Sequence, residues 1–340
     1  MRLSQWISLI ALVAGIYALW QLRLVLLLFA TAIVLATALN QVVQLIQSRT
    51  KIKRWIVVLF VIVTLLLILA LFCVIVVPPL VNQFDELTRL VPLGVRRLNN
   101  WARDIQEVLP PQIAESFRQF ANQLLQSPRA LISELFGNFF SIFSNTLGIL
   151  LDSLLVTVLT IMLLASPPSY RSVLVLLSPA SYRDRLDEIL DRCDTALGGW
   201  AIGILFNMVV ITVLSGLGLW LLGVPLALVN ALIAGALTFI PNFGPALSVV
   251  PPTIIALIES PWKALAVIVL YVVIQQVESN LLTPLVMRRQ VALLPAFTLL
   301  AQVGFAAFFG FLGLFLALPL AILGQVLIRE IVVKDILSHY

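Results

Sequence analysis

Long apolar stretches dominate this chain, and charged residues are confined to short segments between them. Three intervals, residues 55–84, 195–258 and 290–328, contain no Asp, Glu, Lys, Arg or His. Each interval exceeds the roughly 20 residues that a helix needs to cross the hydrocarbon of a bilayer. The pattern predicts an all-α, polytopic integral membrane protein with about eight transmembrane segments, two of them broken or re-entrant, in a single membrane domain over residues 1–340.

Five of the apolar runs are predicted to form ordinary membrane helices, at residues 5–22, 24–46, 55–80, 146–166 and 199–222. The first run resembles a signal peptide in its basic start and apolar body. A second run follows at once, however, and no small-residue cleavage site separates the two. We therefore expect the first run to be retained as a membrane span.

Three further runs, at residues 226–258, 262–280 and 292–328, complete the predicted membrane region. A straight helix over the first or the third would measure about 50 Å or more, at about 1.5 Å per residue, which is too long for one crossing. The first is interrupted around Pro241 and the third contains Gly310. Both runs are expected to be kinked spans or re-entrant hairpins, and we favour hairpins because these keep the later cationic residues in the cytoplasm.

Two polar insertions interrupt the apolar pattern, at residues 81–134 and 167–198. In the first, apolar residues recur every three or four positions, which is typical of an amphipathic helix lying on a membrane, a neighbouring subunit or a partner. These apolar positions are Leu98, Trp101, Ile105 and Val108, followed by Ile113, Phe117, Phe120 and Leu124. The second insertion carries nearly balanced charges and predicts a solvated helix that leads into the next span.

Composition supports the membrane interpretation, since 61% of residues are hydrophobic and 11% are charged, against about 45–50% and about 25% in soluble domains. The net charge of +5 does not favour nucleic acid as a partner, because the cations stand at the ends of apolar runs, where they set topology. The densest cationic group lies at residues 49–54, so we expect this short connection, and both the N- and C-termini, to be cytoplasmic.

Familiar catalytic and metal-binding groups are scarce in this chain. His339 is the only histidine, and Cys73 and Cys193 are the only cysteines. They provide no metal cluster and no pairing of nucleophile and base, and the sequence contains no glycine-rich phosphate-binding loop. The sequence therefore predicts no catalytic residues, no metal and no cofactor, and any active transport would use an ion gradient.

The first candidate site is the interruption at Pro241, Asn242, Gly244 and Pro245. The prolines remove backbone donors, the glycine permits unusual dihedral angles, and the asparagine supplies donor and acceptor groups inside an apolar run. Transport sites tend to lie where a membrane helix is broken, because unwound backbone can bind a solute or an ion. The alternative is a simple kink or loop without a bound solute.

The second candidate site consists of Gln275, Gln276, Glu278 and Asn280, near the end of the run that begins at residue 262. A carboxylate at the centre of a membrane helix costs about 2.5–3.5 kcal/mol on insertion scales, so such a group usually has a partner or a function. Two interpretations of Glu278 stay open: a carboxylate that couples transport to an ion, and a fixed ion pair with Arg288 or Arg289.

Three other polar side chains lie within the apolar runs, and they are expected either to bind solute or to form interhelical hydrogen bonds. They are Asn207, Asn230 and Gln302.

Several of these segments together resemble the signature of the autoinducer-2 exporter family of bacterial permeases. The matching segments, in chain order, are Leu222 to Pro225, Phe239 to Pro245, Gln276 to Asn280, Thr283-Pro284, Val291 to Pro295, and Phe309 to Gly313 followed by Pro319. The resemblance is strong over residues 195–328. One departure is Leu294, where many members have a histidine, so a proton role for that histidine cannot apply here.

The resemblance implies about eight membrane segments, an inner-membrane location and self-association into a homo-oligomer. Family members are described as signal exporters, as permeases and as sodium or lithium/proton antiporters. The function expected for this chain is movement of a small solute or signalling molecule across the inner membrane, coupled to an ion gradient. The alternatives are a sodium or lithium/proton antiporter, a passive channel, and a membrane scaffold that binds a partner through residues 81–134.

Overall fold

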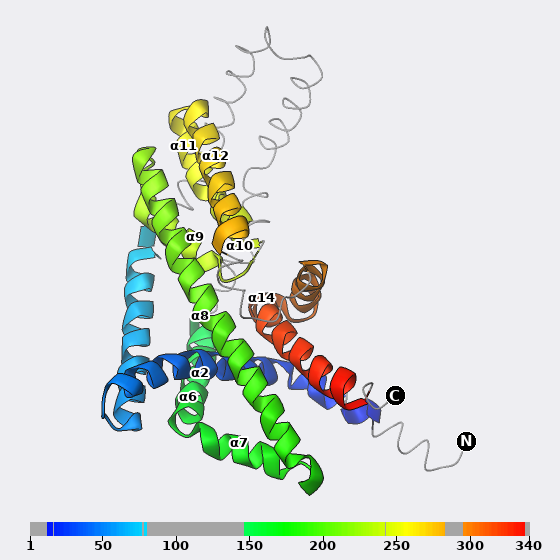
Figure 1. Ribbon diagram of the computed structural model, residues 1–340. Coiled ribbons are helices and arrows are strands. Elements are labelled where there is room, and N and C mark those ends of the chain that lie inside the picture. Colours follow the sequence, from blue (N-terminus) through cyan, green and yellow to red (C-terminus); the bar gives the residue numbers. More distant parts are fainter. Residues whose placement is uncertain are drawn as a thin grey trace, which may run out of the picture. The chain divides into compact units, whose positions relative to one another are not determined.

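The computed structural model describes residues 12–15, 17–76, 78–79, 146–241, 243–282 and 295–336, and helices account for nearly all of these residues (Figure 1). No β-strand occurs in these ranges, so the predicted all-α class is confirmed. The predicted amphipathic insertion at residues 81–134 lies outside the described part of the chain.

Among the described residues, five helices are long and apolar enough to cross a membrane, or six if one bent pair is counted as a single span. This number is smaller than the predicted eight because the first predicted run contributes only the short helix Leu12–Gln21, and the 226–258 run forms helices that are individually short. The polytopic character of the protein follows directly from these helices.

The chain divides into two compact units. One unit contains Met1–Ile62, Leu147–Trp200 and Val291–Tyr340, and the other contains Val63–Thr146 and Ala201–Gln290. Helix α8 (Arg183–Leu221) runs from the first unit into the second.

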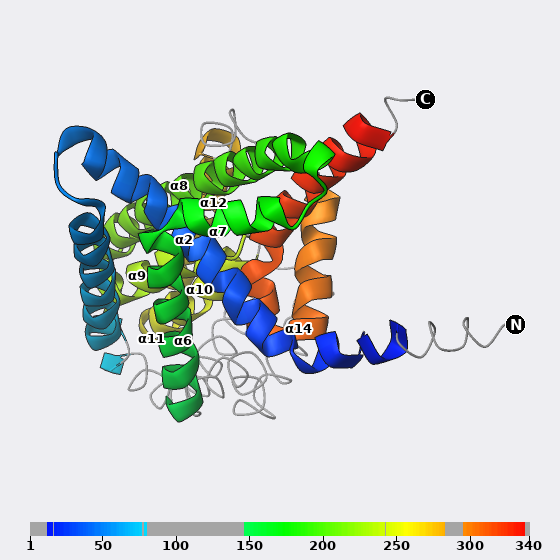
Figure 2. The same cartoon turned by 90° about the horizontal axis from the view of Figure 1, so that it is seen from below.

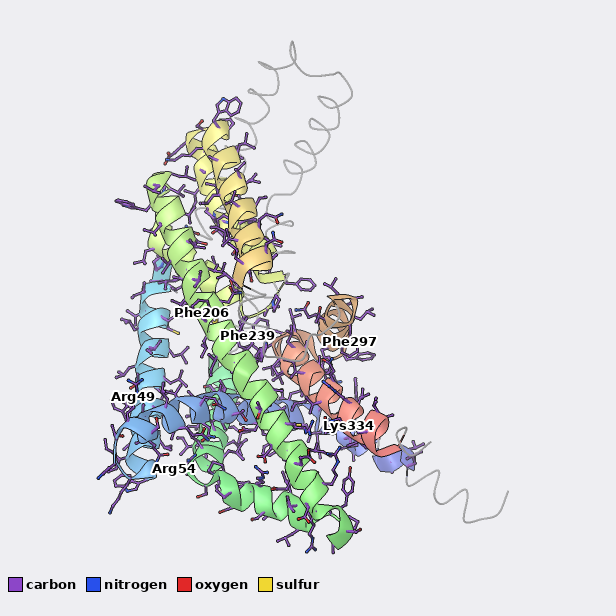
Figure 3. The ribbon with its side chains drawn as sticks, in the orientation of Figure 1. Arg49, Arg54, Phe206, Phe239, Phe297 and Lys334 are labelled. Atoms are coloured by element: carbon purple, nitrogen blue, oxygen red, sulfur yellow. The ribbon has the colours of Figure 1, made fainter. Side chains whose placement is uncertain are left out.

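Helix α2 (Arg23–Arg49) lies in the first unit and is joined by a short connection to the helix Arg54–Val76, which begins in the first unit and continues into the second. At the start of that helix, Arg54 donates a 2.6 Å hydrogen bond to Asn40 Oδ1 and two longer ones to the carbonyl oxygen of Leu164. Figure 3 shows Arg49 and Arg54 at this connection. The predicted cationic connection therefore also links two helices, because Arg54 hydrogen-bonds both to α2 and to the end of α6 (Thr146–Ala165).

Helix α6 ends at Ala165, as the 146–166 run predicts, and α7 (Pro167–Leu176) leaves it at an angle of 85° (Figure 2). Proline occupies the first helical positions of α7, where a missing backbone donor costs nothing and the fixed φ suits a helix start. The bend takes the chain out of its apolar run and into the predicted charged helix.

Charged side chains connect α7, the first turns of α8 and the π-helix η3 (Ile328–Ile336). Arg171 of α7 pairs with Asp187 and Asp191 of α8. Two arginines of the same part of α8, Arg185 and Arg192, pair with a carboxylate of η3. The second insertion therefore contains a helix that continues into the next span, as predicted from its charge pattern.

Glu330 of η3 is the centre of this charge network. Its carboxylate lies 3.1 Å from Arg185 Nη2, 2.9 Å from Arg192 Nη1 and 2.9 Å from Lys334 Nζ, and its side chain is only 3% exposed. Three cations around one buried carboxylate hold the start of α8 against η3, because separating them would leave a buried charge unpaired.

Helix α14 (Pro295–Leu327) is interrupted at Gly310, whose dihedral angles are φ 65° and ψ −144°. This backbone conformation is almost restricted to glycine, because other residues have a Cβ that clashes there. A break at this position was expected from the length of the 292–328 run, and Figures 1 and 2 show that α14 is not one straight rod.

In the second unit, α8 is followed by α9 (Ala227–Leu237), α10 (Phe243–Ser248), α11 (Val250–Glu259) and α12 (Pro261–Val277), which ends in the π-helix η2 (Glu278–Leu282). The ammonium group of Lys263, at the start of α12, donates a 2.8 Å hydrogen bond to the carbonyl of Gly223, just after α8. The chain between these residues therefore returns to the end from which it started, as a re-entrant hairpin requires.

The hairpin turns tightly between α9 and α10. Gly244 is buried, and a Cβ at this position would overlap the carbonyl oxygen of Leu237. Only glycine permits this close approach of the two helices. The interruption predicted at residues 241–245 is thus the tip of the hairpin.

Candidate functional site

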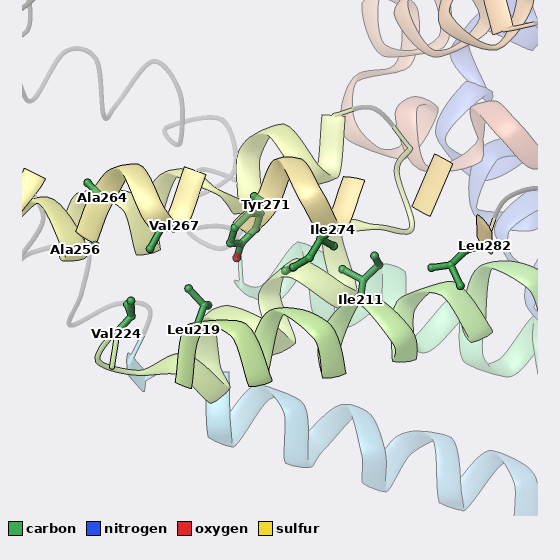
Figure 4. Packing of buried hydrophobic residues seen from close by; sticks show 10 residues of the cluster. Ile211, Leu219, Val224, Ala256, Ala264, Val267, Tyr271, Ile274 and Leu282 are labelled. Carbon is green, nitrogen blue, oxygen red and sulfur yellow. The ribbon is translucent and has the colours of Figure 1, made fainter. Parts of the chain in front are cut away.

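One face of α8 packs against one face of α12 along a continuous seam (Figure 4). On α8 the residues of this face are spaced by four, which places them on a single stripe: Asn207, Ile211, Ser215 and Leu219. The facing stripe consists of Val267, Tyr271 and Ile274 on α12 and of Glu278, the first residue of η2. Apolar members of both stripes belong to one buried cluster, so polar and apolar layers alternate along the seam.

The first polar layer is a hydrogen-bonded pair. Asn207 Nδ2 donates to Glu278 Oε1 over 2.6 Å, and Glu278 is 8% exposed. Of the two roles expected for Asn207, the interhelical hydrogen bond is present. Asn207 precedes the end of α8 at Leu221 by about four turns, roughly 21 Å, which places the pair deep in the apolar part of the helix.

The helix geometry changes at Glu278, where α12 passes into the π-helix η2. A π turn is rare and is found frequently at functional sites, because the wider turn re-aims side chains and loosens backbone hydrogen bonding. Here the change in geometry coincides with the buried carboxylate.

Two oxygens of the pair lack a hydrogen-bond donor within the described residues: Glu278 Oε2 and Asn207 Oδ1. Both atoms accept hydrogen bonds, and a buried acceptor without a donor costs about 1–3 kcal/mol. A proton, a water molecule or a cation can satisfy these two acceptor oxygens, whereas an anion would be repelled by them. The electrostatics of this layer therefore favour a positively charged or hydrogen-donating ligand.

The second polar layer lies two turns further along α8. The hydroxyl oxygens of Ser215 and Tyr271 are buried, and the two hydroxyls interact with each other across the seam. The apolar layer of Ile211 and Ile274 separates them from Asn207 and Glu278.

The hairpin reaches the level of the first polar layer. A Cβ at Gly235, near the end of α9, would overlap the Thr212 hydroxyl and approach the carbonyl oxygen of Met208 on α8. Met208 adjoins Asn207 in the chain, so α9 contacts α8 next to the first polar layer. The structure thus brings the broken segment to the part of α8 that carries Asn207.

Other members of the first predicted site lie at this tip. Gly244 is buried, Pro241 and Pro245 are half-buried, and Asn242 lies outside the described residues. The predicted part of Asn242 in solute binding therefore stays a prediction.

Members of the second predicted site lie on different faces of the helix. Glu278 is buried and Gln275 is half-buried one turn before it, whereas Gln276 and Asn280 are exposed and hydrogen-bond to each other over 2.9 Å. The structure thus separates the inward pair from the outward pair. Arg288 and Arg289, the proposed ion-pair partners of Glu278, lie outside the described residues.

Two residues of the seam were not assigned to a site from the sequence, namely Ser215 and Tyr271. The signal that could have found Ser215 is its spacing of eight from Asn207, which puts both on one helix face. In the described part of the chain, no group of three or more His, Cys, Asp or Glu side chains is arranged to hold a metal ion.

Comparison with known proteins gives a consistent picture. The sequence pattern of AI-2E family transporters matches residues 7–333. YueF of Bacillus subtilis is 27% identical over 71% of this chain and 63% of its own length, and sll0060 of Synechocystis sp. is 26% identical over 86% of this chain and 85% of its own; both are named as presumed transport proteins. The AI-2 transport protein TqsA of Escherichia coli is 31% identical over 35% of this chain and 36% of its own length.

Proposed function

This chain belongs to the AI-2E family of transporters and is a membrane transporter, and we propose that it moves a small solute with energy from a cation gradient, the cation binding at Glu278. The matches span less than two thirds of YueF and of TqsA, so substrate and coupling are proposals for this chain.

The observation that carries the proposal is the unsatisfied oxygen pair at the first polar layer. Glu278 Oε2 and Asn207 Oδ1 are both buried acceptors without donors in the described part of the chain. An ionisable carboxylate inside a membrane segment is expensive, and its usual roles are ion binding and proton transfer. A cation that neutralises Glu278 removes this cost, so binding and release of the cation can alternate with movements of the helices.

The solute is expected at the hairpin tip, close to the same level of α8. The tip supplies a tight turn at Gly244 and a helix break next to Pro241 and Pro245. Broken helices expose backbone groups that can bind a solute at mid-membrane depth. Because α9 contacts α8 one residue from Asn207, a change at Glu278 can be transmitted to the tip through α8.

A second candidate function is exchange of sodium or lithium for protons. It is favoured by the same two oxygens, because carboxylate and amide oxygens are the ligands that small hard cations prefer. In that case the cation is itself the cargo, and Glu278 binds a metal ion and a proton in turn.

We place the protein in the inner membrane with both termini in the cytoplasm, because the cationic connection at residues 49–54 follows the positive-inside rule. Self-association into a homo-oligomer and the absence of catalytic activity remain predictions. A scaffold role would depend on residues 81–134 and gives no reason for a buried carboxylate at the α8–α12 seam.

The proposal is tested in liposomes that contain the purified protein and a fluorescent pH indicator. An imposed pH, sodium or lithium gradient should produce proton movement, and AI-2 is the first solute to add, since TqsA is named for it. Glu278→Gln keeps size and hydrogen bonding but removes the charge, so it should abolish gradient-driven movement. The matched control is Glu259→Gln, which changes an exposed carboxylate. Gradient-driven movement at the wild-type rate in a stable Glu278→Gln protein would overturn the proposal.

A further inference from the structure

The connection between α2 and the helix Arg54–Val76 carries cations that the fold itself does not pair. Arg49, Lys51 and Lys53 are exposed, and within the described residues none of their side chains forms an ion pair or a hydrogen bond. The chain also gives them no acidic neighbour in sequence, because residues 1–84 contain no Asp or Glu. Their positive charges therefore add up on one short segment.

Most other cations in the described part of the chain have a partner. Arg54, the next residue along, donates to Asn40 Oδ1 and to the carbonyl oxygen of Leu164. Further cations contact carboxylates, namely Arg171, Arg185, Arg192, Lys263 and Lys334. The connection thus differs from the rest of the described chain, where cations serve to hold helices together.

Helix electrostatics accounts for only one of the three unpaired cations. Arg49 lies in the last turn of α2, where a cation is favourable because the helix carbonyls point toward it. Lys53 has the opposite position, since its carbonyl oxygen accepts a 3.0 Å hydrogen bond from the Ile56 amide and so begins the next helix. A cation at a helix N-terminus is unfavourable. An anion from outside the described chain would offset this cost.

The position of the connection indicates where that anion comes from. The helices on both sides are long and apolar enough to cross a membrane, and only residues 50–53 join them. So short a segment has to lie where the two spans leave the hydrocarbon, at the depth of the lipid headgroups. Next to the cations, Ile52 is 46% exposed and Trp55 is 63% exposed. Tryptophan is enriched at this depth, and apolar side chains beside cations are typical of segments that contact anionic lipids.

We propose that Arg49, Lys51 and Lys53 form a binding site for the phosphate of an anionic phospholipid, with Ile52 and Trp55 against the apolar part of the same lipid. Phosphate oxygens accept charge-assisted hydrogen bonds from lysine and arginine, and each cation near an anionic leaflet adds to the attraction. This site goes beyond the proposed transport function and does not depend on it.

Lipid binding at this site should stabilise the helices around it. Lys53 adjoins Arg54, whose guanidinium holds α2 and the end of α6 together through Asn40 and Leu164. The unpaired cations repel Arg54, and a bound anion reduces this repulsion. The expected result is a higher melting temperature when an anionic phospholipid is bound.

The test follows the melting temperature of the purified full chain in detergent while phosphatidylglycerol is added. The melting temperature should rise to a plateau, added salt should weaken the effect, and zwitterionic phosphatidylcholine should have little effect. The variant Lys51→Gln with Lys53→Gln should need roughly 25-fold more phosphatidylglycerol for the same rise, at about fivefold per cation. Without lipid, this variant should melt at the wild-type temperature or above it.

A control of equal charge is Arg23→Gln with Arg329→Gln, which also removes two exposed cations. This control should respond to phosphatidylglycerol as the wild type does. Equal losses of response in the two double variants would overturn the proposal, because the lipid would then follow net charge alone.

Inorganic phosphate separates a lipid from a soluble anion. Free phosphate lacks the apolar part that Ile52 and Trp55 would contact, so at the same concentration it should give no comparable rise. A full rise with inorganic phosphate would overturn the assignment to a lipid. Should the Lys51→Gln, Lys53→Gln variant fail to fold, Lys51→Gln alone decides, with an expected shift of about fivefold; an unshifted response would contradict the site.

Discussion

Asn207 and Glu278 are separated by 71 positions in the chain, yet Asn207 Nδ2 lies 2.6 Å from Glu278 Oε1. The bond joins the apolar part of α8 to the π turn at the end of α12, and both partners are charged or strongly polar groups in a membrane segment. Hydrogen bonds to a charged group are stronger than those between neutral groups. This pair is therefore the contact through which the charge state of Glu278 can affect the packing of α8 against α12.

Replacing Asn207 by leucine should destabilise the protein as long as Glu278 is present. The carboxylate then loses the hydrogen bond from Asn207, and the loss of a hydrogen bond to a charged group is worth about 1.5–3 kcal/mol. In the Glu278→Leu background the same change should cost far less, because no buried carboxylate is left unpaired. Unfolding in detergent, followed for all four proteins, gives the interaction energy directly. If the effects of the two substitutions on the free energy of unfolding are additive, the hydrogen bond between Asn207 and Glu278 contributes nothing to stability.

The sequence predicted the class of fold and the positions of the breaks, because both depend on local features. Apolar run length sets the spans, and Gly310 and Pro241 mark the interruptions. It also identified Glu278 as exceptional, since a lone carboxylate in an apolar run is visible without a structure. The residues predicted to act with Glu278, however, lie on different faces of the helix, with Gln275 inward and Gln276 outward.

The partners of these residues could not be predicted in the same way. Pairing of Asn207 with Glu278 depends on which faces of α8 and α12 meet, and that is decided by packing between distant segments. The sequence left two interpretations of Glu278 open, a coupling carboxylate and an ion pair with Arg288 or Arg289, and both arginines lie outside the described residues. The network at Glu330 was missed for the same reason, since Arg185 lies 145 positions away.

Replacing Gly310 by alanine should destabilise α14, and a glycine on the same helix provides a matched control. At both Gly310 and Gly304, an added Cβ would meet no heavy atom within 4 Å, so the available space is equal. Of the two, only Gly310 has a positive φ, of 65°. A side chain in this conformation costs about 1–3 kcal/mol. Gly310→Ala should therefore lower the melting temperature, while Gly304→Ala should leave it unchanged or raise it. Equal effects of the two substitutions would contradict the helix break at Gly310.

Replacing Gly244 by alanine should prevent the hairpin from closing. The added Cβ would overlap the carbonyl oxygen of Leu237, a backbone atom that cannot move aside without opening the turn. We expect a large loss of folded protein, measured as the monodisperse fraction in size-exclusion chromatography. Gly324→Ala is the control, because a Cβ there would meet nothing within 4 Å. Normal yield and activity of Gly244→Ala would show that the tip is looser than its contacts imply.

Replacing Glu330 by glutamine should lower the melting temperature by several degrees. Arg185, Arg192 and Lys334 would then face one another without the carboxylate between them. Glu259→Gln is a close control, because Glu259 also pairs with a lysine four residues later, but its side chain is 45% exposed. A similar melting temperature for both variants would indicate that the Glu330 network is no stronger than a surface ion pair.

The contact between Lys263 and Gly223 predicts that both ends of the α9–α11 hairpin emerge on one side of the membrane. Single cysteines at Leu221 and Trp262, both exposed, test this in a chain that lacks Cys73 and Cys193. With the termini in the cytoplasm, α8 runs outward, so an impermeant thiol reagent added to intact cells should label both positions. A cysteine at Ile240, which is buried near the tip, should stay unlabelled. Labelling of only one end would contradict the hairpin, whereas protection of both ends until the cells are opened would keep the hairpin and reverse the orientation.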